Sequence, residues 1–433
     1  MRARPCEMLT KEENDLVTQT GPGTPGGAFM RQYWQAVGLS TELPPGGRPL
    51  PRRILSEDLL LFRDDAGRVG MLGLLCSHRC ADLSYGRIEN GGLRCLYHGW
   101  LFDVTGRVLE MPAEPPESTY KDKVRHLAYP CVERGGVIFA YFGTGEPPEL
   151  PNYEFFDYPA EHRVLVRTFL NCNWLQSMEG EMDPSHLSYL HVPIGKVDTR
   201  PVPGGTQPAD QLYKVDSAPK LEVERTHYGM RNFSVRRAGP GKRYLRITNF
   251  VLPDMATIIG NEGRIGEGYG VHWHVPVDDT HHLRIDCSFN RVRPPNKEFS
   301  ESTMAGEIRP DGYLVRNAAN RYLQDAAEMK TETFSGMGPY FPAHDAFATE
   351  SPGPIHDRTR EHLGTSDVCI TTARRILIDA IRAVQRGETP PHVIRGTDAN
   401  DMSDIAVISA VIPDDVDYRT NWREAAAQTL VAR

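Results

Sequence analysis

The sequence predicts an α+β protein with two main units: an all-β unit near the N-terminus, then an antiparallel sheet covered by a long helix. Residues 50–145 read as short strands separated by turn signals. After about residue 160, longer strands are followed by an amphipathic helix over 366–387. The Pro-rich stretch GTGEPPELP lies between the two units. We therefore expect an N-terminal helical arm at 1–45, a β domain at 46–148 and a second domain at 149–433.

The arm and the β domain carry clear local signals. Thr10 followed by Glu13 fits a capping box, and GPGTPGG ends the helix that the box begins. In the β domain, a hairpin turns at Asp65-Ala66-Gly67, LFDVTGRVLEM repeats the hairpin pattern, and ERGGVIFAYFG adds a further β stretch. These signals predict a small domain of hairpins.

The second domain mixes both kinds of element. A helix interrupted around Pro184 is expected first, because proline breaks the hydrogen-bond pattern of a helix. Residues 200–217 are expected to form a mobile loop, and a run of strands follows from about residue 220 to 292. Ser366 is a plausible cap of the long helix, which Gly387 ends.

Composition excludes several functional classes. The 433 residues carry a formal net charge of −8 without a long basic run, so nucleic acid is not expected as a partner. No apolar stretch reaches the ~18 residues that span a bilayer, so no membrane partner is expected. The N-terminus turns acidic where a signal peptide needs an apolar core, and the eight cysteines are too sparse for a secreted disulfide scaffold. We expect a cytoplasmic protein.

Two Cys/His pairs stand close together in the β domain. Cys76 and His78 are separated by one residue, Cys95 and His98 by two, and sixteen residues lie between the pairs. They could be scattered core residues, although the paired spacing speaks against that. A Cys₂His₂ zinc site is chemically possible. The third interpretation is a Rieske 2Fe–2S centre, in which two thiolates hold one iron and two imidazoles hold the other.

A second set of candidate ligands lies about ninety residues further on. NWLQSMEGEMDPSHLSYLH contains His186 and His191, with Asp183 three residues before the first of them. A spacing of five does not bring two side chains to one face of a regular helix, but a distortion at Pro184 makes it possible. Two histidines and one carboxylate are the usual ligands of a non-haem Fe(II) that activates oxygen. By itself this histidine pair is a weak signal.

The motifs resemble a known family. CSHR and CLYHGW with a following F-D-x-x-G hairpin are similar to the Rieske domain of ring-hydroxylating oxygenases. NWLQ-x-x-EG-x-x-D-x-x-H-x₄-H looks like the catalytic signature of the large (alpha) subunit of these Rieske non-haem iron oxygenases. Its form, together with VPVDD and ESPGPIHDRTREHLGTSD, is closest to the phthalate dioxygenase-like branch. The resemblance covers nearly the whole chain and implies a helix-grip catalytic domain after the Rieske domain.

Roles for individual residues follow from the resemblance. It implies that Cys76, His78, Cys95 and His98 bind the cluster, with Gly99 turning the backbone over it and Trp100 packed behind. The two residues between Cys95 and His98 leave no room for the disulfide of electron-transport Rieske proteins, so Cys80 is expected to be a packed small residue. The third ligand beside His186 and His191 would be Asp345, five residues before Glu350, rather than Asp325.

The resemblance also implies two catalytic residues that are not ligands. Asp183 would link the two metals across a subunit boundary, accepting hydrogen bonds from His78 or His98 of one subunit and from His186 or His191 of the next. The alternative is an aspartate that caps a turn before Pro184. Asn173 is expected near the iron, unless its amide bonds only to backbone.

The implied activity is that of a terminal oxygenase, with one Rieske 2Fe–2S cluster and one mononuclear Fe(II) per subunit. Electrons from NAD(P)H would arrive through a separate reductase carrying FMN and a plant-type 2Fe–2S cluster, because no Gly-rich dinucleotide motif follows a strand here. O₂ and a small aromatic substrate would meet at the Fe(II). The expected assembly is a homotrimer or two stacked trimers.

The reaction itself stays open at this point. Ring dihydroxylation or aryl-ether cleavage of an aromatic carboxylate is favoured, with O- or N-demethylation by a monooxygenase as the alternative. A non-enzymatic Rieske electron carrier and a structural zinc protein are less favoured. An aromatic carboxylate would need a buried arginine. Arg243 and Arg246 in KRYLRITNF are candidates and are expected to share one face of a strand, Arg246 being preferred for the substrate.

Overall fold

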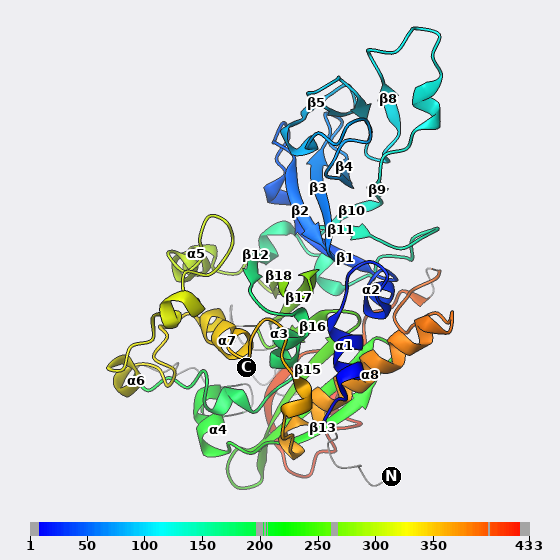
Figure 1. Cartoon of the computed structure of the whole chain (residues 1–433). Helices are drawn as coiled ribbons and strands as arrows, with labels where there is room; N and C mark the ends of the chain where they lie inside the picture. Colours follow the sequence, from blue (N-terminus) through cyan, green and yellow to red (C-terminus); the bar gives the residue numbers. More distant parts are fainter. Residues whose placement is uncertain are drawn as a thin grey trace.

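The computed structural model of the chain describes residues 8–195, 202, 205, 207–260, 267–396 and 399–424. Figure 1 shows a small β domain at one end and a larger sheet with its helices at the other. The helices are α1 (Lys11–Thr18), α2 (Pro25–Met30), α3 (Trp174–Glu181), α4 (Ala209–Val215), α5 (Lys297–Met304), α6 (Glu328–Thr331), α7 (Phe341–Glu350) and α8 (Val368–Gln385).

The β domain consists of two small antiparallel sheets. The first has the order β2 (Leu50–Ile54), β3 (Glu57–Arg63), β4 (Val69–Gly73) and β9 (Ala128–Tyr129). The second has the order β5 (Arg87–Glu89), β6 (Gly92–Arg94), β7 (Leu101–Phe102) and β8 (Val108–Glu110). The predicted turn joins β3 to β4, where Gly67 has φ +84 and the Asp64 carboxylate accepts the N–H groups of Ala66 and Arg68. The core between the sheets includes Phe62, Phe102 and Trp100, and the buried cysteines Cys76 and Cys95 belong to it.

A third sheet shows that the arm ends earlier than expected. Its order is β1 (Trp34–Leu39), β11 (Val137–Tyr141) and β10 (Cys131–Arg134). Residues 34–39 were expected in the arm, but they pair with β11 and so join the end of the arm to the end of the β domain. Before β1, helices α1 and α2 pack on α8, and α1 begins with the predicted capping box of Thr10 and Glu13.

The large sheet has eight antiparallel strands. Its order is β12 (Arg163–Leu170), β18 (His281–Asn290), β17 (Gly268–Asp278), β16 (Met255–Ile258), β15 (Lys242–Val251), β14 (Gly229–Arg237) and β13 (Lys220–Arg225), with β19 (Ile408–Pro413) paired to β15. Helices α3 and α8 pack against this sheet. The other face of β14 and β15 is covered by the C-terminal segment through Tyr418 and Trp422. This is the antiparallel sheet with a long helix that the sequence predicts, within an α+β fold.

Two predicted details of the second domain have different outcomes. The break at Pro184 is confirmed, since α3 ends at Glu181 and only a short 3₁₀ turn, His186–Ser188, follows. The mobile loop at 200–217 is wrong over part of its length, because α4 occupies Ala209–Val215 and Leu212 is buried against Tyr244. Residues 200, 201, 203, 204 and 206 lie outside the described residues.

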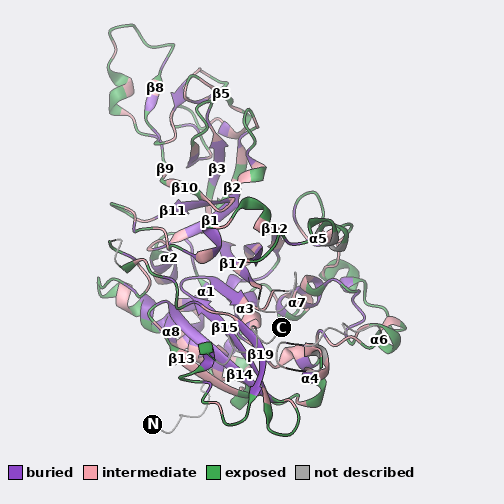
Figure 2. Cartoon of the chain, turned by 180° about the vertical axis from the view of Figure 1, so that it is seen from behind, coloured by how far each residue is buried: buried purple, intermediate pink, exposed green. Residues whose placement is uncertain are grey.

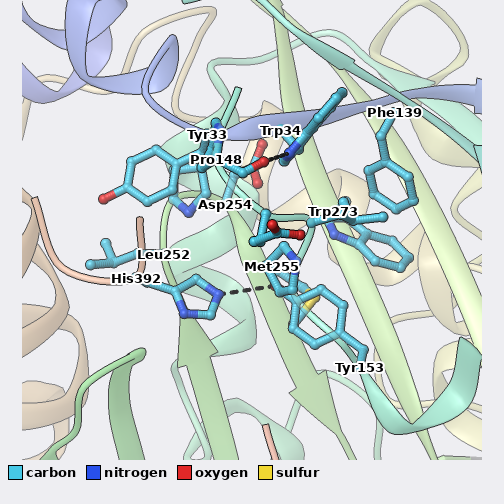
Figure 3. Close-up of a pocket in the computed structure, with 14 residues that line it drawn as sticks. Tyr33, Trp34, Phe139, Pro148, Tyr153, Leu252, Asp254, Met255, Trp273 and His392 are labelled. Atoms are coloured by element: carbon cyan, nitrogen blue, oxygen red, sulfur yellow. Dashed lines mark hydrogen bonds between the residues drawn. The ribbon is translucent and has the colours of Figure 1, made fainter. Parts of the chain in front are cut away.

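Burial follows this architecture. Figure 2 shows the strands of the large sheet mostly buried, whereas α5 and α6 lie at an exposed edge. Where the two domains meet, a small pocket of about 20 Å³ is lined by Asp254 among other residues (Figure 3). Burial raises the pKa of Asp254 well above its ordinary value. Tyr153 and His392, which line the same pocket, form a hydrogen bond with 3.1 Å between Oη and Nε2. In the part of the chain that the structure describes, no helix is long and apolar enough to cross a membrane.

Candidate metal centres

The two Cys/His pairs lie on two loops with the same backbone form. In the first loop, the N–H of Cys76 donates to the Ala81 carbonyl at 2.9 Å, and the N–H of Cys80 donates back to the Cys76 carbonyl at 2.9 Å. The second loop repeats this, because Cys95 donates to the Trp100 carbonyl at 2.8 Å and Gly99 donates to the Cys95 carbonyl at 3.1 Å. Backbone hydrogen bonds therefore fix the position of the cysteine in each loop.

The fourth residue after each cysteine closes the loop in a left-handed conformation. Gly99 has φ +75, and a Cβ there would come within 3.1 Å of the Pro112 ring. Its predicted role in the tight turn is confirmed. The equivalent residue of the first loop is Cys80, with φ +56. Cys80 was expected to be packed, but its side chain is exposed because this corner of the loop points to solvent.

The two cysteines lie deeper in the β domain than the two histidines. Cys76 and Cys95 are buried, whereas the rings of His78 and His98 lie nearer the surface, with 4.4 Å between their centroids. Burial raises the pKa of the Cys76 thiol to about 11, and the neighbouring Cys95 adds to this effect. The indole of Trp100 stacks on His78, with 4.6 Å between the ring centroids.

The four residues fit a Rieske cluster. Nδ1 of His98 is buried and has no hydrogen-bond partner among the described residues. A free imidazole nitrogen beside two buried thiols is the donor set that such a cluster uses, with sulfur on one iron and nitrogen on the other. The inner iron would take the cysteines and the outer iron the histidines.

The second centre brings together residues far apart in the sequence. His186 and His191 follow the broken end of α3, and Asp345 lies on α7. One donor atom from each of the three lies within 4.8 Å of the other two, the only such group of three or more His, Cys, Asp or Glu found in the described ranges. Two imidazoles and one carboxylate on one side of a metal fit Fe(II) with open positions. Asp325 lies outside the group, and its carboxylate caps the turn at Ala327 and Glu328.

The charges around these three side chains keep the carboxylate of Asp345 ionised. Nε2 of His191 lies 2.9 Å from Oδ1 of Asp345. Burial alone would raise the pKa of Asp345, but His191, His186 and Arg284 hold it at about 2. Burial alone would lower the pKa of His186, and the nearby carboxylates Asp183 and Asp345 raise it instead. A carboxylate that is always ionised is ready to bind a cation.

Asp183 stands beside the three candidate ligands without joining them. Its Oδ1 accepts the N–H of Ser185 at 2.7 Å, and its Oδ2 lies 3.6 Å from Nδ1 of His186. Although burial works against ionisation, the contacts with His186 and with the backbone of Ser185 lower the pKa of Asp183. An anionic acceptor at the outer nitrogen of a ligand histidine fixes the ring and its tautomer.

The signature residues before Asp183 anchor α3. Nε2 of Gln176 donates to the carbonyl groups of Thr349 at 2.6 Å and Gly353 at 2.9 Å, which ties α3 to the end of α7. Glu179 is buried between Arg358 and Arg374, at 2.9 Å and 2.6 Å. Sequence reasoning gave these residues no role, although Q-x-x-E spacing on one helix face was a usable signal. They set α3 against α7 and thereby bring the histidines to Asp345.

Asn173 does not have the catalytic position expected for it. It is the N-cap of α3, and its Oδ1 accepts the N–H of Leu175 at 3.2 Å. Its Nδ2 donates to the carbonyls of Thr18 at 2.9 Å and Asp279 at 2.8 Å. The whole length of α3 separates Asn173 from Asp183, so the structure gives Asn173 a capping role instead.

The two candidate substrate arginines lie on opposite faces of β15. They are three residues apart, and side chains alternate along a strand, so the expectation that they share a face is wrong. Arg243 faces the C-terminal segment and pairs with Asp414 at 3.2 Å. Arg246 faces the side of α4, where Nη1 donates to the Tyr213 hydroxyl at 2.6 Å.

Arg246 is buried without a counter-charge. It makes no ion pair with any described residue, and its buried Nε has no hydrogen-bond partner among them. The guanidinium of Arg236 also lies over the Tyr213 ring, 5.0 Å from its centroid, and forms no ion pair with a described carboxylate. Burial and the nearby Arg246 lower the pKa of Arg236 to about 10. Arg236 donates to the Pro184 carbonyl at 2.8 Å, so this positive region adjoins the loop of His186.

Two further features near this centre were not foreseen. The partly buried Glu181 lies 2.7 Å from Nδ1 of His272 and 3.6 Å from Arg284, and Arg284 pairs with Asp286 at 2.7 Å. These groups lie far apart in sequence, and no motif joins them. A cavity of about 600 Å³ borders the ring of His191 and is lined by His344, Phe341, Arg316 and Glu328 among others.

Two family models match the chain. The model of the Rieske [2Fe-2S] domain matches residues 33–128, and a model described as LigXa C-terminal domain like matches residues 140–431. The first contains all four Cys/His residues, and the second contains both histidines and the carboxylate of the second centre.

Similar proteins cover almost the whole chain. The oxygenase subunit of phthalate 4,5-dioxygenase from Pseudomonas putida is 38% identical, over 95% of this chain and 94% of its own. The oxygenase subunit of 3-chlorobenzoate-3,4-dioxygenase from Comamonas testosteroni is 35% identical, over 89% and 91%. Among solved structures, the terminal oxygenase of carbazole 1,9a-dioxygenase from Novosphingobium sp. KA1 matches with a TM-score of 0.56 at 20% identity, over 86% of this chain and 97% of that one. That match supports the fold.

Proposed function

Because the chain belongs to the Rieske non-haem iron oxygenases, in the phthalate dioxygenase-like branch, we propose that it is the terminal oxygenase that hydroxylates an aromatic carboxylate. An enzyme of this family has one Rieske 2Fe–2S cluster and one mononuclear iron. The observation that carries the substrate class is Arg246, a buried guanidinium without a carboxylate partner among the described residues. Buried charges are usually paired, so a missing counter-charge indicates an anionic ligand.

Each metal has a specific set of side chains in this proposal. Cys76 and Cys95 hold one iron of the cluster, and His78 and His98 hold the other. The group His186, His191 and Asp345 holds the mononuclear Fe(II). When bound, the cluster supplies electrons one at a time, and the Fe(II) provides the open positions at which O₂ is activated.

Asp183 connects the two centres in the assembled enzyme. Its Oδ2 is available to His186, and its side chain keeps about a quarter of its surface exposed in the single chain. A carboxylate accepts several hydrogen bonds at once, so a histidine of a neighbouring subunit's cluster, His78 or His98, can donate to it as well. This requires the expected homotrimer or stacked trimers, in which a β domain lies over the catalytic domain of the next subunit.

Arg246 orients the substrate. Nη1 holds the Tyr213 hydroxyl, which leaves the other N–H groups of the guanidinium for a carboxylate. The Tyr213 ring covers Arg246, with the guanidinium carbon 5.4 Å from the ring centroid. A planar guanidinium binds a carboxylate through two parallel hydrogen bonds, which fixes the direction of the aromatic ring as well as its charge.

The electrons come from a separate protein. We propose an NAD(P)H-dependent reductase with FMN and a plant-type 2Fe–2S cluster, in the cytoplasm where reduced nicotinamide is available. The oxygenase of carbazole 1,9a-dioxygenase has been solved in complex with a ferredoxin. Whether this chain also needs a ferredoxin is tested by adding one to the purified oxygenase and reductase.

Two other functions are tested by the same assay. O- or N-demethylation uses the same metal centres, and a non-enzymatic electron carrier would use the β domain alone. The second donor set and the domain around it favour an enzyme over a carrier. Oxygenase and reductase are mixed with NADH, O₂ and a panel of aromatic acids with their neutral amides. We expect NADH use that depends on an acid and yields a diol containing both atoms of ¹⁸O₂. Release of formaldehyde would indicate a demethylase, and NADH use without any oxygenated product would contradict the oxygenase.

A further inference from the structure

His344 lies directly behind one of the candidate iron ligands. Its Nδ1 is 3.2 Å from Nδ1 of His191, and its Nε2 is 2.8 Å from the carbonyl oxygen of Gly338. The side chain is 2% exposed, so both contacts are largely shielded from bulk water. His191 thus has Asp345 at its Nε2 and His344 at its Nδ1.

These contacts determine where the protons lie. A carbonyl oxygen only accepts hydrogen bonds, so Nε2 of His344 must carry the hydrogen that faces Gly338. A neutral imidazole then has a bare Nδ1, which accepts. The hydrogen between the two rings therefore belongs to Nδ1 of His191. With a metal ion bound, the lone pair of His191 therefore lies on Nε2, so that Nε2 and the carboxylate of Asp345 both face the candidate iron site.

We propose that His344 is a positioning residue that holds His191 in the tautomer and orientation that bind Fe(II). This rests on the proposed function, because it takes His186, His191 and Asp345 as the iron ligands. A ligand histidine commonly donates its second N–H to an acceptor in the next layer of residues, and loss of that acceptor weakens metal binding. His344 is that acceptor for His191.

One helix supplies both the ligand and the support. Phe341, His344 and Asp345 are residues i, i+3 and i+4 of α7, so they share one face. Phe341 stacks on the ring of His191 with 4.1 Å between centroids and 8° between planes, and His344 lies nearly parallel to it, at 5.3 Å and 17°. The register of a single helix turn therefore sets the orientation of His191 relative to Asp345.

The two histidine ligands have different acceptors. His186 faces the carboxylate of Asp183, an anion, whereas His191 faces a neutral imidazole. A charged acceptor increases the basicity of the histidine, and a neutral one mainly fixes its direction. We expect His344 to contribute to iron retention more than to electron transfer between the centres.

The experiment measures how fast iron leaves the reconstituted full-length enzyme. His344→Leu keeps the size of the side chain but provides no acceptor, so iron release to a chelator at constant pH should be about 10- to 100-fold faster than in the wild type. His344→Asn places an amide oxygen where Nδ1 stood and should restore most of the retention. In Co(II)-loaded protein, the visible ligand-field bands should shift in the Leu variant and return in the Asn variant.

Phe341→Leu is the matched control, because it removes a ring stacked on His191 without removing a hydrogen bond. Because the stacked ring also helps to hold His191, iron release in this variant should be somewhat faster than in the wild type but clearly slower than in His344→Leu. The proposal is overturned if His344→Leu retains iron as the wild type does, or if Phe341→Leu and His344→Leu release it equally fast. Far-UV circular dichroism confirms that each variant is folded, and the Rieske EPR signal confirms that its cluster is loaded.

Two further measurements keep the result interpretable. If the Leu variant does not fold, His344→Ala replaces it, because the 600 Å³ cavity that His344 lines gives imidazole access to the vacated position. Added imidazole should then slow iron release, with the wild type in imidazole as reference, and no slowing would overturn the proposal. His191→Ala distinguishes an error in the assigned iron ligands from an error in the role given to His344. If that variant keeps its mononuclear iron, the assignment of the iron ligands fails; if it loses the iron while His344→Leu does not, only the role of His344 fails.

Discussion

The two proposed metal centres of this chain are built in opposite ways. The Cys/His centre uses four residues between positions 76 and 98, on two loops that backbone hydrogen bonds shape alike. The second centre joins His191 to Asp345, 154 residues further along, and side chains hold its parts together. Gln176 and Glu179 anchor α3, while α7 carries Asp345. The first centre depends on local turns, and the second depends on how two helices pack.

This difference predicts how each centre responds to change. A substitution in a loop of the β domain should affect the cluster and leave the second centre intact. The second centre should respond to changes in residues that touch no metal, because its geometry depends on distant ion pairs and hydrogen bonds. Asp183 is the residue through which the two centres should depend on each other.

The largest effect is expected from Cys95→Ala. Without one thiolate the inner iron cannot be held, so the cluster's visible absorbance, its acid-labile sulfide and its EPR signal should disappear. Mononuclear iron should remain, because its ligands lie in the other domain. Absorbance and metal analysis of the purified variant are the measurements. A normal Rieske EPR signal would refute the ligand assignment.

Asp183→Asn should slow electron transfer between the two centres while both keep their metals. An amide carries no charge and must donate as well as accept, so one of its two histidine contacts is lost. We expect transfer from the reduced cluster to the iron to slow by about 100-fold. Single-turnover mixing of reduced enzyme with substrate and O₂ follows cluster reoxidation by absorbance. Wild-type rates at full iron content would mean that another residue joins the centres.

Arg246→Met should affect only charged substrates. A hydrogen-bonded carboxylate contributes about 1.5–3 kcal/mol to binding, so kcat/KM for an aromatic acid should fall by about 10- to 100-fold. A neutral amide of the same ring should react almost unchanged. Arg243→Met is the control, since it removes an arginine from the opposite face of the same strand. Equal losses for the acid and the amide would assign Arg246 a structural role.

The smallest effect on activity is expected from Glu361→Gln, which tests the support of the second centre. Glu361 pairs with Arg374, which also holds Glu179. Burial alone would raise the pKa of Glu361, but Arg374 and His356 hold it at about 2. The folded-state pKa is below the unfolded value of about 4.3, so the pair stabilises the protein above that pH and loses this as pH falls toward 2.

At pH 7 the Gln variant should be less stable by up to about 3 kcal/mol, the amount that the lowered pKa represents. The difference in the free energy of unfolding between the variant and the wild type should become smaller as the pH falls below about 4.5. Denaturant unfolding at several pH values measures this difference. A gap that stays constant with pH would indicate lost packing rather than lost charge.

The same contrast explains what the sequence could predict. Cys76, His78, Cys95 and His98 stand in one short pattern, and the hairpins around them follow from local turn residues, so both were recognisable. The capping box at Thr10 and the helix ending before Gly387 were equally local. The structure begins that helix at Val368, with Asp367 at the N-cap rather than Ser366.

Features that depend on tertiary packing were predicted less well. Asn173 was assigned to catalysis because it lies in the signature, but only the fold reveals that its amide caps α3. His344 was visible beside Asp345, yet its contact with His191 spans 153 residues. The end of the arm was misplaced because the pairing of β1 with β11 joins residues about one hundred positions apart. Local patterns carry no information about such contacts.

The central claim is that one chain holds a 2Fe–2S cluster and a separate mononuclear iron. Iron and acid-labile sulfide are measured together in the wild type and in His191→Ala. A cluster contains equal amounts of both, so the wild type should have an excess of iron equal to one atom per chain. The excess should vanish in His191→Ala while the Rieske EPR signal stays unchanged. Equal iron and sulfide in the fully loaded wild type, or an excess that survives in His191→Ala, would contradict the claim.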